Sequence, residues 1–522
     1  MDTRTGPDPS DDARTPATSW VLAATLIPSA SAVLACVDPR LRHWFLIPVT
    51  VCGVLIGADA FEWLRRRRDV FDPQAILGLF GVHFYYLAPV LHVLLDYWPP
   101  LLHPSAAGWR SALGALALLN MVGLAFYRVV LSLPERNSRQ AAPVRLDPAR
   151  FQSVALMAIV VGVLAFGAEV VLLGGPGGFL TAMTQDRTAL AGMGWLLLLS
   201  ESFPLLLFCL VLVRWRQLLC RRVDLVVVLL VGLVAVQFLV GGLRGSRSAV
   251  LWPLVLGLVL VHLLVRPITR KAFVASAVAV VMFVYAYGLY KGAGVEVVDI
   301  AKGTRTVEEV STETGRDLPT VLLADLGRAD VQALLLDRQR LVAADWSYGS
   351  TYVAAPLLLV PGSAGAERFR SKSAIGTDVL YGPGVYESGV NSQRVFGVTG
   401  EAILNFGPVG GLLSFVFLGL FLRFATRYYA RARQRDDLAA KLLCLPLCAI
   451  TVILVTADLD NILAFYVGQA LPLALVVLCA MARGPRTAVG HHQYRQSVPN
   501  ELVASNQCKY PKECIRWTTC MS

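Results

Sequence analysis

The sequence predicts an all-α, polytopic integral membrane protein with about twelve transmembrane helices and one long extracytoplasmic loop. Of its 522 residues, 56% are hydrophobic and only 16% are charged, whereas a soluble chain carries about 25% charged residues. Apolar runs of about 18 residues or more, enough to cross a hydrocarbon core of about 30 Å, recur along most of the chain. Backbone groups in lipid must be hydrogen-bonded within the chain, so we expect the spans to be helices.

The apolar runs define twelve expected spans. They cover residues 18–37, 43–61, 74–97, 109–132, 151–174, 193–213, 224–242, 249–265, 272–290, 402–422, 438–457 and 462–482. The chain thus divides into a polar N-terminus (1–17), nine spans (18–290), a long loop (291–401), three spans (402–482) and a tail (483–522), whose part after 487 we expect to be disordered. The acidic N-terminus lacks the basic region of a cleaved signal peptide, so the first span is expected to be retained.

Basic residues fall in every second connection. These basic segments are 65–68, 136–145, 214–222, 266–271, 423–435 and 483–486. Under the positive-inside rule one topology accommodates all six, with both termini in the cytoplasm. The net charge of +11 is therefore assigned to membrane orientation, and the lack of a basic soluble domain argues against nucleic-acid binding. The ten cysteines follow no zinc spacing, and we expect neither a metal nor another cofactor.

Two arginines break this charge pattern. Arg244 and Arg247 lie in GGLRGSRSAV (241–250), the short outer connection between the seventh and eighth spans. One interpretation is that both side chains snorkel to lipid phosphates or water. The other is an anion site, because arginine makes bidentate phosphate contacts and the N–H groups that open a helix favour an anion. A lipid-linked phosphate or pyrophosphate fits the second interpretation.

The tenth span opens at the same face with a carboxylate. Glu401 lies in GVTGEAILNFGPVGG (397–411), and Asn405 follows at i+4 on the same helix face. The glycines and proline of GPVGG are expected to loosen the helix or to admit a close neighbour. Glu401 is either a general base or substrate contact, or a carboxylate favoured by the helix dipole.

Four further carboxylates lie at or near the outer face. Asp458 and Asp460, in the turn ADLDNI, would not share a face of a helix, and a solvated turn is an equally simple interpretation. Glu169 and Glu201 lie within spans, where an ionisable residue is functional by default. Pairing of either glutamate with an arginine is equally compatible with the sequence.

These pieces, in their order, resemble the oligosaccharide repeat-unit polymerases, the Wzy-type O-antigen and exopolysaccharide polymerases. The resemblance rests on the Arg-Gly-Ser-Arg turn at 244–247, RAD at 328–330, WSYGSTYVAAPLLLVP at 346–361 and GEAILNFGPVGG at 400–411. The family pattern is matched by Tyr348, Gly349, Tyr352 and Pro361. Gly362 stands where the family has arginine, and Arg368 or Arg370 is the expected substitute. The resemblance covers roughly residues 224–480.

The resemblance implies a GT-C-like, metal-independent glycosyltransferase of the bacterial cytoplasmic membrane. It would polymerise undecaprenyl-pyrophosphate-linked oligosaccharide repeat units into a surface or secreted polysaccharide at the outer face, with a chain-length regulator and a flippase as partners. Arg244 and Arg247 would stabilise the leaving pyrophosphate, and Glu401 is the first candidate base, ahead of Asp330 and Asp458. The residues expected to bind sugar or phosphate are Arg328, Asp330, Tyr348, Tyr352, Arg394, Asn405 and Asp458.

Two other functions fit the same features. A glycan ligase of the O-antigen ligase type also has about a dozen spans and outer arginines, but that family uses a histidine in the outer loop, and residues 291–401 contain none. A transporter or flippase for lipid-linked oligosaccharides would perform no chemistry, and such proteins often contain inverted repeats. Arginine and glutamate at the membrane midplane would favour transport, whereas the same residues at the outer surface beneath the loop favour glycosyl transfer.

Overall fold

The computed structural model confirms the predicted all-α class. It describes residues 15–99, 102, 108–134, 146–185, 187–190, 192–293, 300, 302–314, 317–341, 346–359, 369–390, 392, 394–435 and 437–481. Over these residues the regular structure is helical, apart from one isolated antiparallel bridge between Leu146 and Met481. Twelve helices of the described chain are long and apolar enough to cross a membrane. The protein is therefore a multi-pass membrane protein.

The twelve spans follow the predicted runs closely. They are α2 (Thr15–Val37), α3 (Leu46–Leu64), α4–η2–α5 (Pro73–Val82, His83–Leu87, Ala88–Leu94), α6 (Trp109–Ser132), α7 (Pro148–Leu172), α9–α10 (Gly194–Ser200, Phe203–Arg214), α12–η4 (Val223–Gln237, Phe238–Gly242), α13–η5 (Arg247–Leu260, Val261–Val265), α14 (Arg270–Ala293), α20 (Gly397–Gln434), α21 (Leu438–Thr456) and α22–η9–α23 (Leu459–Phe465, Tyr466–Ala470, Leu471–Ala480). The largest difference is the tenth span, because α20 begins before the predicted residue 402 and continues through the basic stretch to Gln434.

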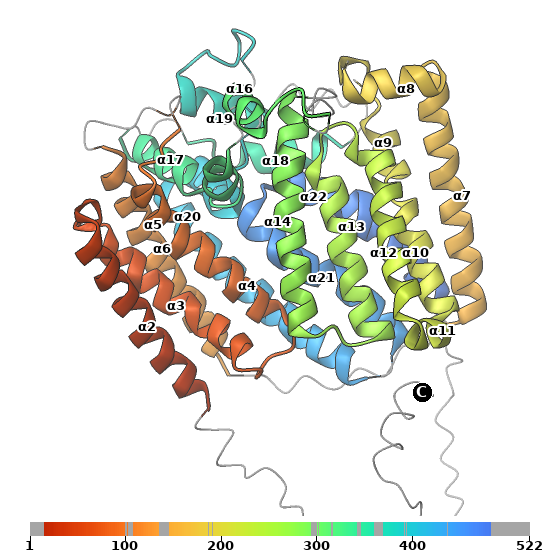
Figure 1. Ribbon diagram of the computed structural model, residues 1–522, viewed down its shortest axis with the longest axis horizontal. Helices are drawn as coiled ribbons and strands as arrows, with labels where there is room; N and C mark the ends of the chain where they lie inside the picture. Colours follow the sequence, from red (N-terminus) through yellow and green to blue (C-terminus); the bar gives the residue numbers. More distant parts are fainter. Residues whose placement is uncertain are drawn as a thin grey trace, which may run out of the picture.

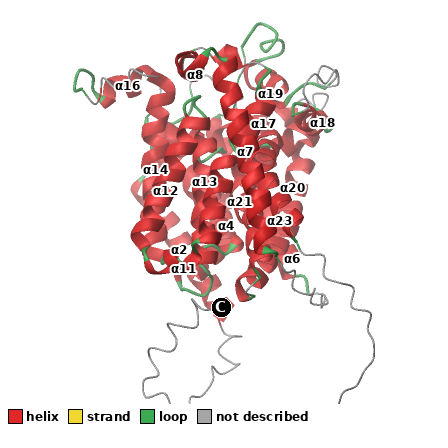
Figure 2. Cartoon of the chain, turned by 90° about the vertical axis from the view of Figure 1, so that its right-hand side faces the viewer, coloured by secondary structure: helices red, strands yellow, loops and turns green. Residues whose placement is uncertain are grey.

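The helices stand side by side, and their connections gather at two ends (Figures 1 and 2). One end, here the loop end, carries the short helices α8 (Gly175–Thr184), α16 (Val307–Thr314), α17 (Ala329–Leu341), α18 (Ser350–Leu357) and α19 (Lys372–Tyr381), together with η7 (Thr320–Asp325). The other, here the basic end, carries α11 (Arg216–Arg221), the segments 65–72 and 266–269, and residues 435 and 437. Of the six basic segments, 136–145 and 483–486 lie outside the described residues, as does the tail after 487.

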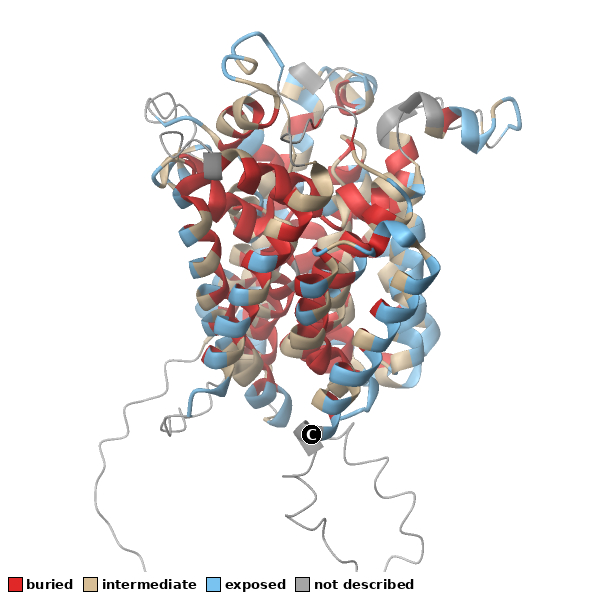
Figure 3. Cartoon of the chain, turned by 90° about the vertical axis from the view of Figure 1, so that its left-hand side faces the viewer, coloured by how far each residue is buried: buried red, intermediate tan, exposed pale blue. Residues whose placement is uncertain are grey.

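Burial separates inner helices from peripheral ones (Figure 3). Helices α2, α7, α12 and α14 are mostly exposed, while α4–α5, α13 and α21 are mostly buried. The exposed surface of the peripheral helices is apolar: Leu164, Val228 and Met282 are 66%, 64% and 67% exposed. A bundle in water would bury such residues, so this surface fits contact with lipid.

Small residues allow the closest helix contacts in the bundle. A β-carbon on Gly123 of α6 would lie 2.2 Å from the Phe415 ring of α20, and one on Gly419 would lie 3.0 Å from Val130. Glycine at such positions lets two membrane helices approach closely. The α6–α20 contact places the start of α20 beneath the loop-end helices.

Helix α20 is broken near its start, as GPVGG predicted. Phe406 (φ −137°, ψ 18°) and Gly407 (φ 61°, ψ −155°) are not helical, and Pro408 has no backbone N–H to restore the ladder. A β-carbon on Gly407 would lie 2.4 Å from the indole of Trp346. The break therefore requires glycine at residue 407 for two reasons: the φ is positive, and the Trp346 indole occupies the space that a side chain would need. It separates a short segment, residues 397–405, from the long part of the span.

Replacing Gly407 with alanine is expected to destabilise the protein by at least about 1–3 kcal/mol, because the residue would keep a positive φ and would clash with Trp346. The unfolding temperature of the purified protein in detergent measures this effect. Gly232→Ala in α12 is the matched control, since a β-carbon there meets no atom within 4 Å. Equal unfolding temperatures for the two variants would contradict the role assigned to Gly407.

Candidate functional site

Ten polar residues beneath the loop-end helices form one contiguous group, here the loop-end cluster. Its members are Arg247, Asp325, Arg328, Asp330, Thr351, Lys372, Arg394, Glu401, Asn405 and Asp458. They come from α13, α17 to α20 and the short connections beside these helices. Seven of the ten were predicted from the sequence to bind substrate or to act in catalysis. One is Arg247 of the 241–250 turn, and the other six are Arg328, Asp330, Arg394, Glu401, Asn405 and Asp458.

Arg247 links the membrane turn to the loop. Its Nη1 lies 2.6 Å from Oδ2 of Asp325 at the end of η7. Arg328 lies just beyond, at a positive φ of 57° that is strained for a residue with a side chain. Its Nη1 donates to the Ala324 carbonyl at 2.8 Å, while its buried Nε has no hydrogen-bond partner among the described residues. Burial lowers the pKa of Arg328 despite nearby aspartates, but a guanidinium stays charged.

Asp330 is a fully buried carboxylate in the first turn of α17. Its nearest cationic partner is Arg394, whose Nη1 lies 3.6 Å from Oδ2. Neither carboxylate oxygen has a hydrogen bond from the described part of the chain. Asp330 therefore keeps acceptor capacity that a ligand hydroxyl would use, whereas a buried acceptor left unsatisfied costs free energy.

Glu401 holds three chain segments together. Its Oε1 accepts a hydrogen bond from the Thr351 hydroxyl at 2.9 Å, and its Oε2 accepts one from the Leu459 backbone N–H at 2.7 Å. Asn405, predicted to share its face, donates to the same Thr351 hydroxyl oxygen at 2.7 Å. The Leu459 N–H opens α22, so Glu401 interacts with the N-terminus of a neighbouring helix as well as lying in the first turns of its own.

Asp458 is buried, and the solvated-turn interpretation is wrong for it. One oxygen accepts from Nζ of Lys372 at 2.7 Å and the other from the Phe396 backbone N–H at 2.8 Å. Asp460 also approaches the same ammonium, at 3.5 Å. The two aspartates converge on one lysine because Asp458 precedes α22 as its N-cap and does not follow helical spacing.

The two predicted tyrosines occupy different positions. Tyr348 has a positive φ of 46° and a side chain that is 70% exposed. Its backbone N–H donates to the Asn405 carbonyl at 2.9 Å. Tyr352 is partly buried, with its ring 6.2 Å from that of Phe406 at the break in α20. Tyr348 is thus free to contact a ligand from outside, while Tyr352 supports the helix beneath.

The arginines of the membrane turn do not snorkel. Arg244 pairs with Glu201 in the sixth span, and its side chain is 22% exposed against 20% for Arg247. The alternative in which Glu201 pairs with an arginine is therefore the observed one. Arg370, a proposed substitute for the family's missing arginine, pairs instead with Asp378 at 2.5 Å, and its side chain is half exposed. Pro361, Gly362 and Arg368 lie outside the described residues.

Sequence reasoning missed four residues of this region: Asp325, Thr351, Lys372 and His92. His92, at the loop end of the third span, is fully buried and within electrostatic range of Asp330. Its Nδ1 lies 2.8 Å from the Tyr97 carbonyl, and because a carbonyl only accepts, Nδ1 carries the proton. The Nε2 lone pair is buried and has no partner in the described chain. The sequence held no signal for this, since a histidine in an apolar run is usually core.

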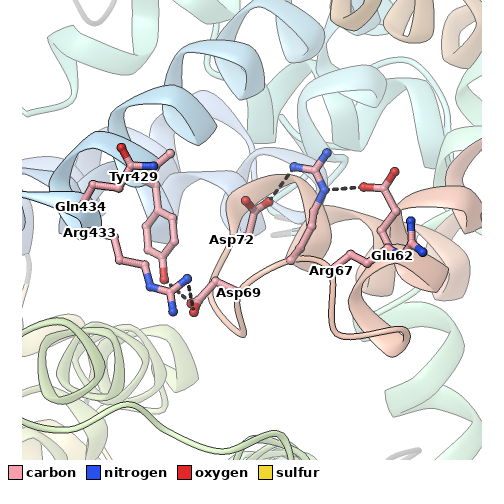
Figure 4. A pocket seen from close by; sticks show the side chains of 9 residues that line it. Glu62, Arg67, Asp69, Asp72, Tyr429, Arg433 and Gln434 are labelled. Carbon is pink, nitrogen blue, oxygen red and sulfur yellow. Dashed lines mark hydrogen bonds and ion pairs between the residues drawn. The ribbon is translucent and has the colours of Figure 1, made fainter. Parts of the chain in front are cut away.

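A cavity lies at the basic end, away from this cluster (Figure 4). It has a volume of about 530 Å³ and is lined by Glu62, Arg67, Arg68, Asp69, Asp72, Tyr429, Ala430, Arg433 and Gln434. Its charges are largely paired within the protein: Arg68 with Glu62 (2.5 Å), and Asp69 with Arg433 (2.8 Å). The loop end also contains ion pairs, but there the buried Nε of Arg328 and both carboxylate oxygens of Asp330 lack hydrogen-bond partners in the described chain, whereas no buried side-chain atom lining the basic-end cavity does. The loop end is therefore the better candidate for a ligand site.

Comparisons with protein-family models, curated proteins and solved structures gave no match to this chain. The fold defines the class, a multi-pass helical membrane protein. The site defines what is special about it: three arginines and a lysine, interleaved with buried carboxylates, at the end of the bundle opposite the basic connections.

Proposed function

We propose that this protein is a membrane glycosyltransferase that polymerises undecaprenyl-pyrophosphate-linked oligosaccharide repeat units. The loop end faces outward from the bacterial cytoplasmic membrane, and both chain termini lie in the cytoplasm. One observation carries the proposal: Arg247, Arg328 and Arg394, from three separate segments, meet beside buried carboxylates at the loop end. Separate elements converging on one set of cations are suited to hold a polyanionic group at the membrane surface.

The chemistry asks for two things that this arrangement supplies. The acceptor hydroxyl oxygen attacks the anomeric carbon of the donor, and the bond to the pyrophosphate breaks with its electron pair on the leaving group. Arg244, Arg247 and Arg328 stabilise the charge that develops there. The acceptor proton needs a base, and the free oxygens of Asp330 favour it over Glu401, whose two oxygens already accept hydrogen bonds. Glu401 then positions Thr351, and through it Asn405.

Reconstitution tests this function. The protein is placed in liposomes with the lipid-pyrophosphate-linked repeat unit of its host, and the products are separated on a gel. A ladder of longer lipid-linked glycans is expected for the wild type and none for Arg244→Ala. Arg244→Lys is also expected to fail, because an ammonium does not make a bidentate contact. Arg222→Ala, which removes an exposed arginine paired with Asp224 at the basic end, is the matched control and should give the full ladder.

Two outcomes would replace the proposal. Movement of the substrate across the bilayer without a ladder would identify a transporter. A single glycan transfer without a ladder would identify a ligase-type enzyme. One observation supports this alternative: Nε2 of His92, in the third span, has no hydrogen-bond partner in the described chain and could act as the histidine base that the loop lacks. In that case His92→Gln should abolish transfer, whereas the polymerase proposal assigns the proton to Asp330.

A further inference from the structure

A second polar group lies inside the bundle, toward the loop end: Glu169 is three residues before the end of α7. It consists of Glu169 on α7, Glu201 at the end of α9, Gln237 on α12 and Gln469 in η9. All four are buried, with Glu169 and Gln237 completely inaccessible. These residues belong to four different spans, and Glu201 forms the ion pair with Arg244 of the membrane turn.

Acceptors outnumber donors in this group. Gln237 and Gln469 both donate from Nε2 to the Glu201 backbone carbonyl, at 3.4 Å and 3.0 Å. Their Oε1 atoms, and both carboxylate oxygens of Glu169, are buried without a hydrogen-bond partner in the described chain. The Ser200 hydroxyl lies close enough to Glu169 to interact with its carboxyl group, but its hydrogen bond is made to the Leu197 carbonyl, at 3.0 Å. Unsatisfied buried acceptors indicate that a hydrogen or a cation is required here.

The charges do not balance if both carboxyl groups are ionised. Glu169 faces Glu201 and Arg244, and these are the titratable groups that face it; the two glutamines are neutral. One guanidinium compensates one carboxylate, and the ion pair of Arg244 is with Glu201. A second carboxylate buried without a counter-charge is disfavoured so strongly that it takes a proton instead. Because no ion pair is formed by Glu169 within the described chain, it is the carboxyl group that we expect to carry the proton.

We propose that Glu169 and Glu201 form a proton-binding site coupled to substrate binding at Arg244. Glu169 is protonated both with and without bound ligand. Glu201 takes one proton from solution when a diphosphate draws Arg244 away from it. This second step rests on the proposed function, in which Arg244 binds pyrophosphate. Once Arg244 has moved, Glu201 would be a buried carboxylate without its partner, a strongly destabilising state that protonation removes.

Gly241 lies directly beside the Glu201 carboxyl group. A β-carbon on it would lie 2.8 Å from Oε1 of Glu201, so the carboxyl group packs directly against the backbone at the start of the turn. The same turn carries Arg244 three residues later. The carboxyl group that takes the proton and the arginine that binds the diphosphate are thus placed on either side of one tight turn.

Infrared spectroscopy of the protein in lipid nanodiscs tests the resting proton. A carbonyl stretching band of a protonated carboxylic acid, shifted in D₂O, is expected at neutral pH and should be lost in Glu169→Gln. Glu62→Gln, which removes a glutamate paired with Arg68 at the basic end, should retain the band. Loss of the band on adding Na⁺, or no difference between Glu169→Gln and the wild type, would overturn the proton assignment.

Titration with geranyl diphosphate, a short isoprenyl diphosphate, tests the coupling. Uptake of one proton per bound ligand is expected, so affinity should weaken by up to tenfold per pH unit as pH rises. Glu201→Gln should bind the ligand more tightly and without proton uptake. Binding by the wild type without proton uptake would overturn the coupling and leave the proposed function standing. An absence of binding would overturn both, and the infrared band would still decide the state of Glu169.

Discussion

Replacing Arg247 with alanine is expected to reduce polymer formation about 10²–10³-fold, the usual effect of removing one preorganised donor from a developing anion. Arg247 is suited to this role because it extends from the start of α13 to Asp325 and adjoins Arg328. The measurement is the rate of ladder formation in proteoliposomes at equal protein abundance. The matched control is Arg370→Ala, which removes an arginine of the same end that pairs with Asp378 and should leave the rate unchanged.

The same substitution leaves Asp325 without its arginine, and a second variant separates this effect from catalysis. The double variant Arg247→Ala/Asp325→Ala removes both charges. If the loss came only from the change around the Asp325 carboxylate, the double variant would regain polymer formation. We expect no recovery, because the anion still lacks Arg247. A wild-type rate in Arg247→Ala would refute the role assigned to this arginine.

Replacing Lys372 with methionine is expected to cost about 3–5 kcal/mol of stability, because it leaves Asp458 fully buried without its counter-charge. The double variant Lys372→Met/Asp458→Asn should recover much of this loss, since no ion then remains unpaired. Unfolding temperatures in detergent give the comparison. Arg370→Ala, which breaks a half-exposed pair, should change stability by less than about 1 kcal/mol. Equal effects of Lys372→Met and Arg370→Ala would contradict this assignment.

The Lys372 contribution also has a defined pH range. Burial acts to lower the pKa of Lys372, but Asp458 and Asp460 outweigh burial and raise it above the ordinary value of 10.5. A group whose pKa is raised on folding stabilises the protein below its unfolded pKa and loses that contribution as pH rises through the folded value. The stability difference between wild type and Lys372→Met should therefore be constant up to about pH 10 and shrink above it.

The fold could be read from the sequence because each span is a local, continuous signal. A run of apolar residues specifies its own helix in lipid, and the arginines of alternate connections fixed the count of twelve. The long loop is not such a signal: its elements η7 and α17 are separated at residues 326–328. The strained φ of Arg328 at that break depends on tertiary contacts, which periodicity does not contain.

Only part of the candidate site could be predicted from the sequence, because most of its contacts are also long-range. Arg244 and Arg247 stood out because they violate a charge rule, but their partners, Glu201 and Asp325, lie 43 and 78 residues away along the chain. Lys372 gave no signal at all, since a lysine in a polar loop is ordinarily solvated. Its burial against Asp458 arises from the packing of α19 against α17 and α18, long-range contacts that a single sequence does not reveal.

The pairing of Asp69 at the basic end has a mechanical consequence. The Asp69 carboxylate lies 2.8 Å from Nε2 of His262 and forms an ion pair with the Arg433 guanidinium. Arg270 donates a hydrogen bond to the Arg68 carbonyl at 2.7 Å. The short segment 65–72 thus connects the ends of α3, α4, η5, α14 and α20. At the loop end the corresponding ties run through Arg244 and Arg247, whose partners an incoming anion would replace. Anion binding is therefore expected to loosen helix contacts at the loop end while those at the basic end stay in place.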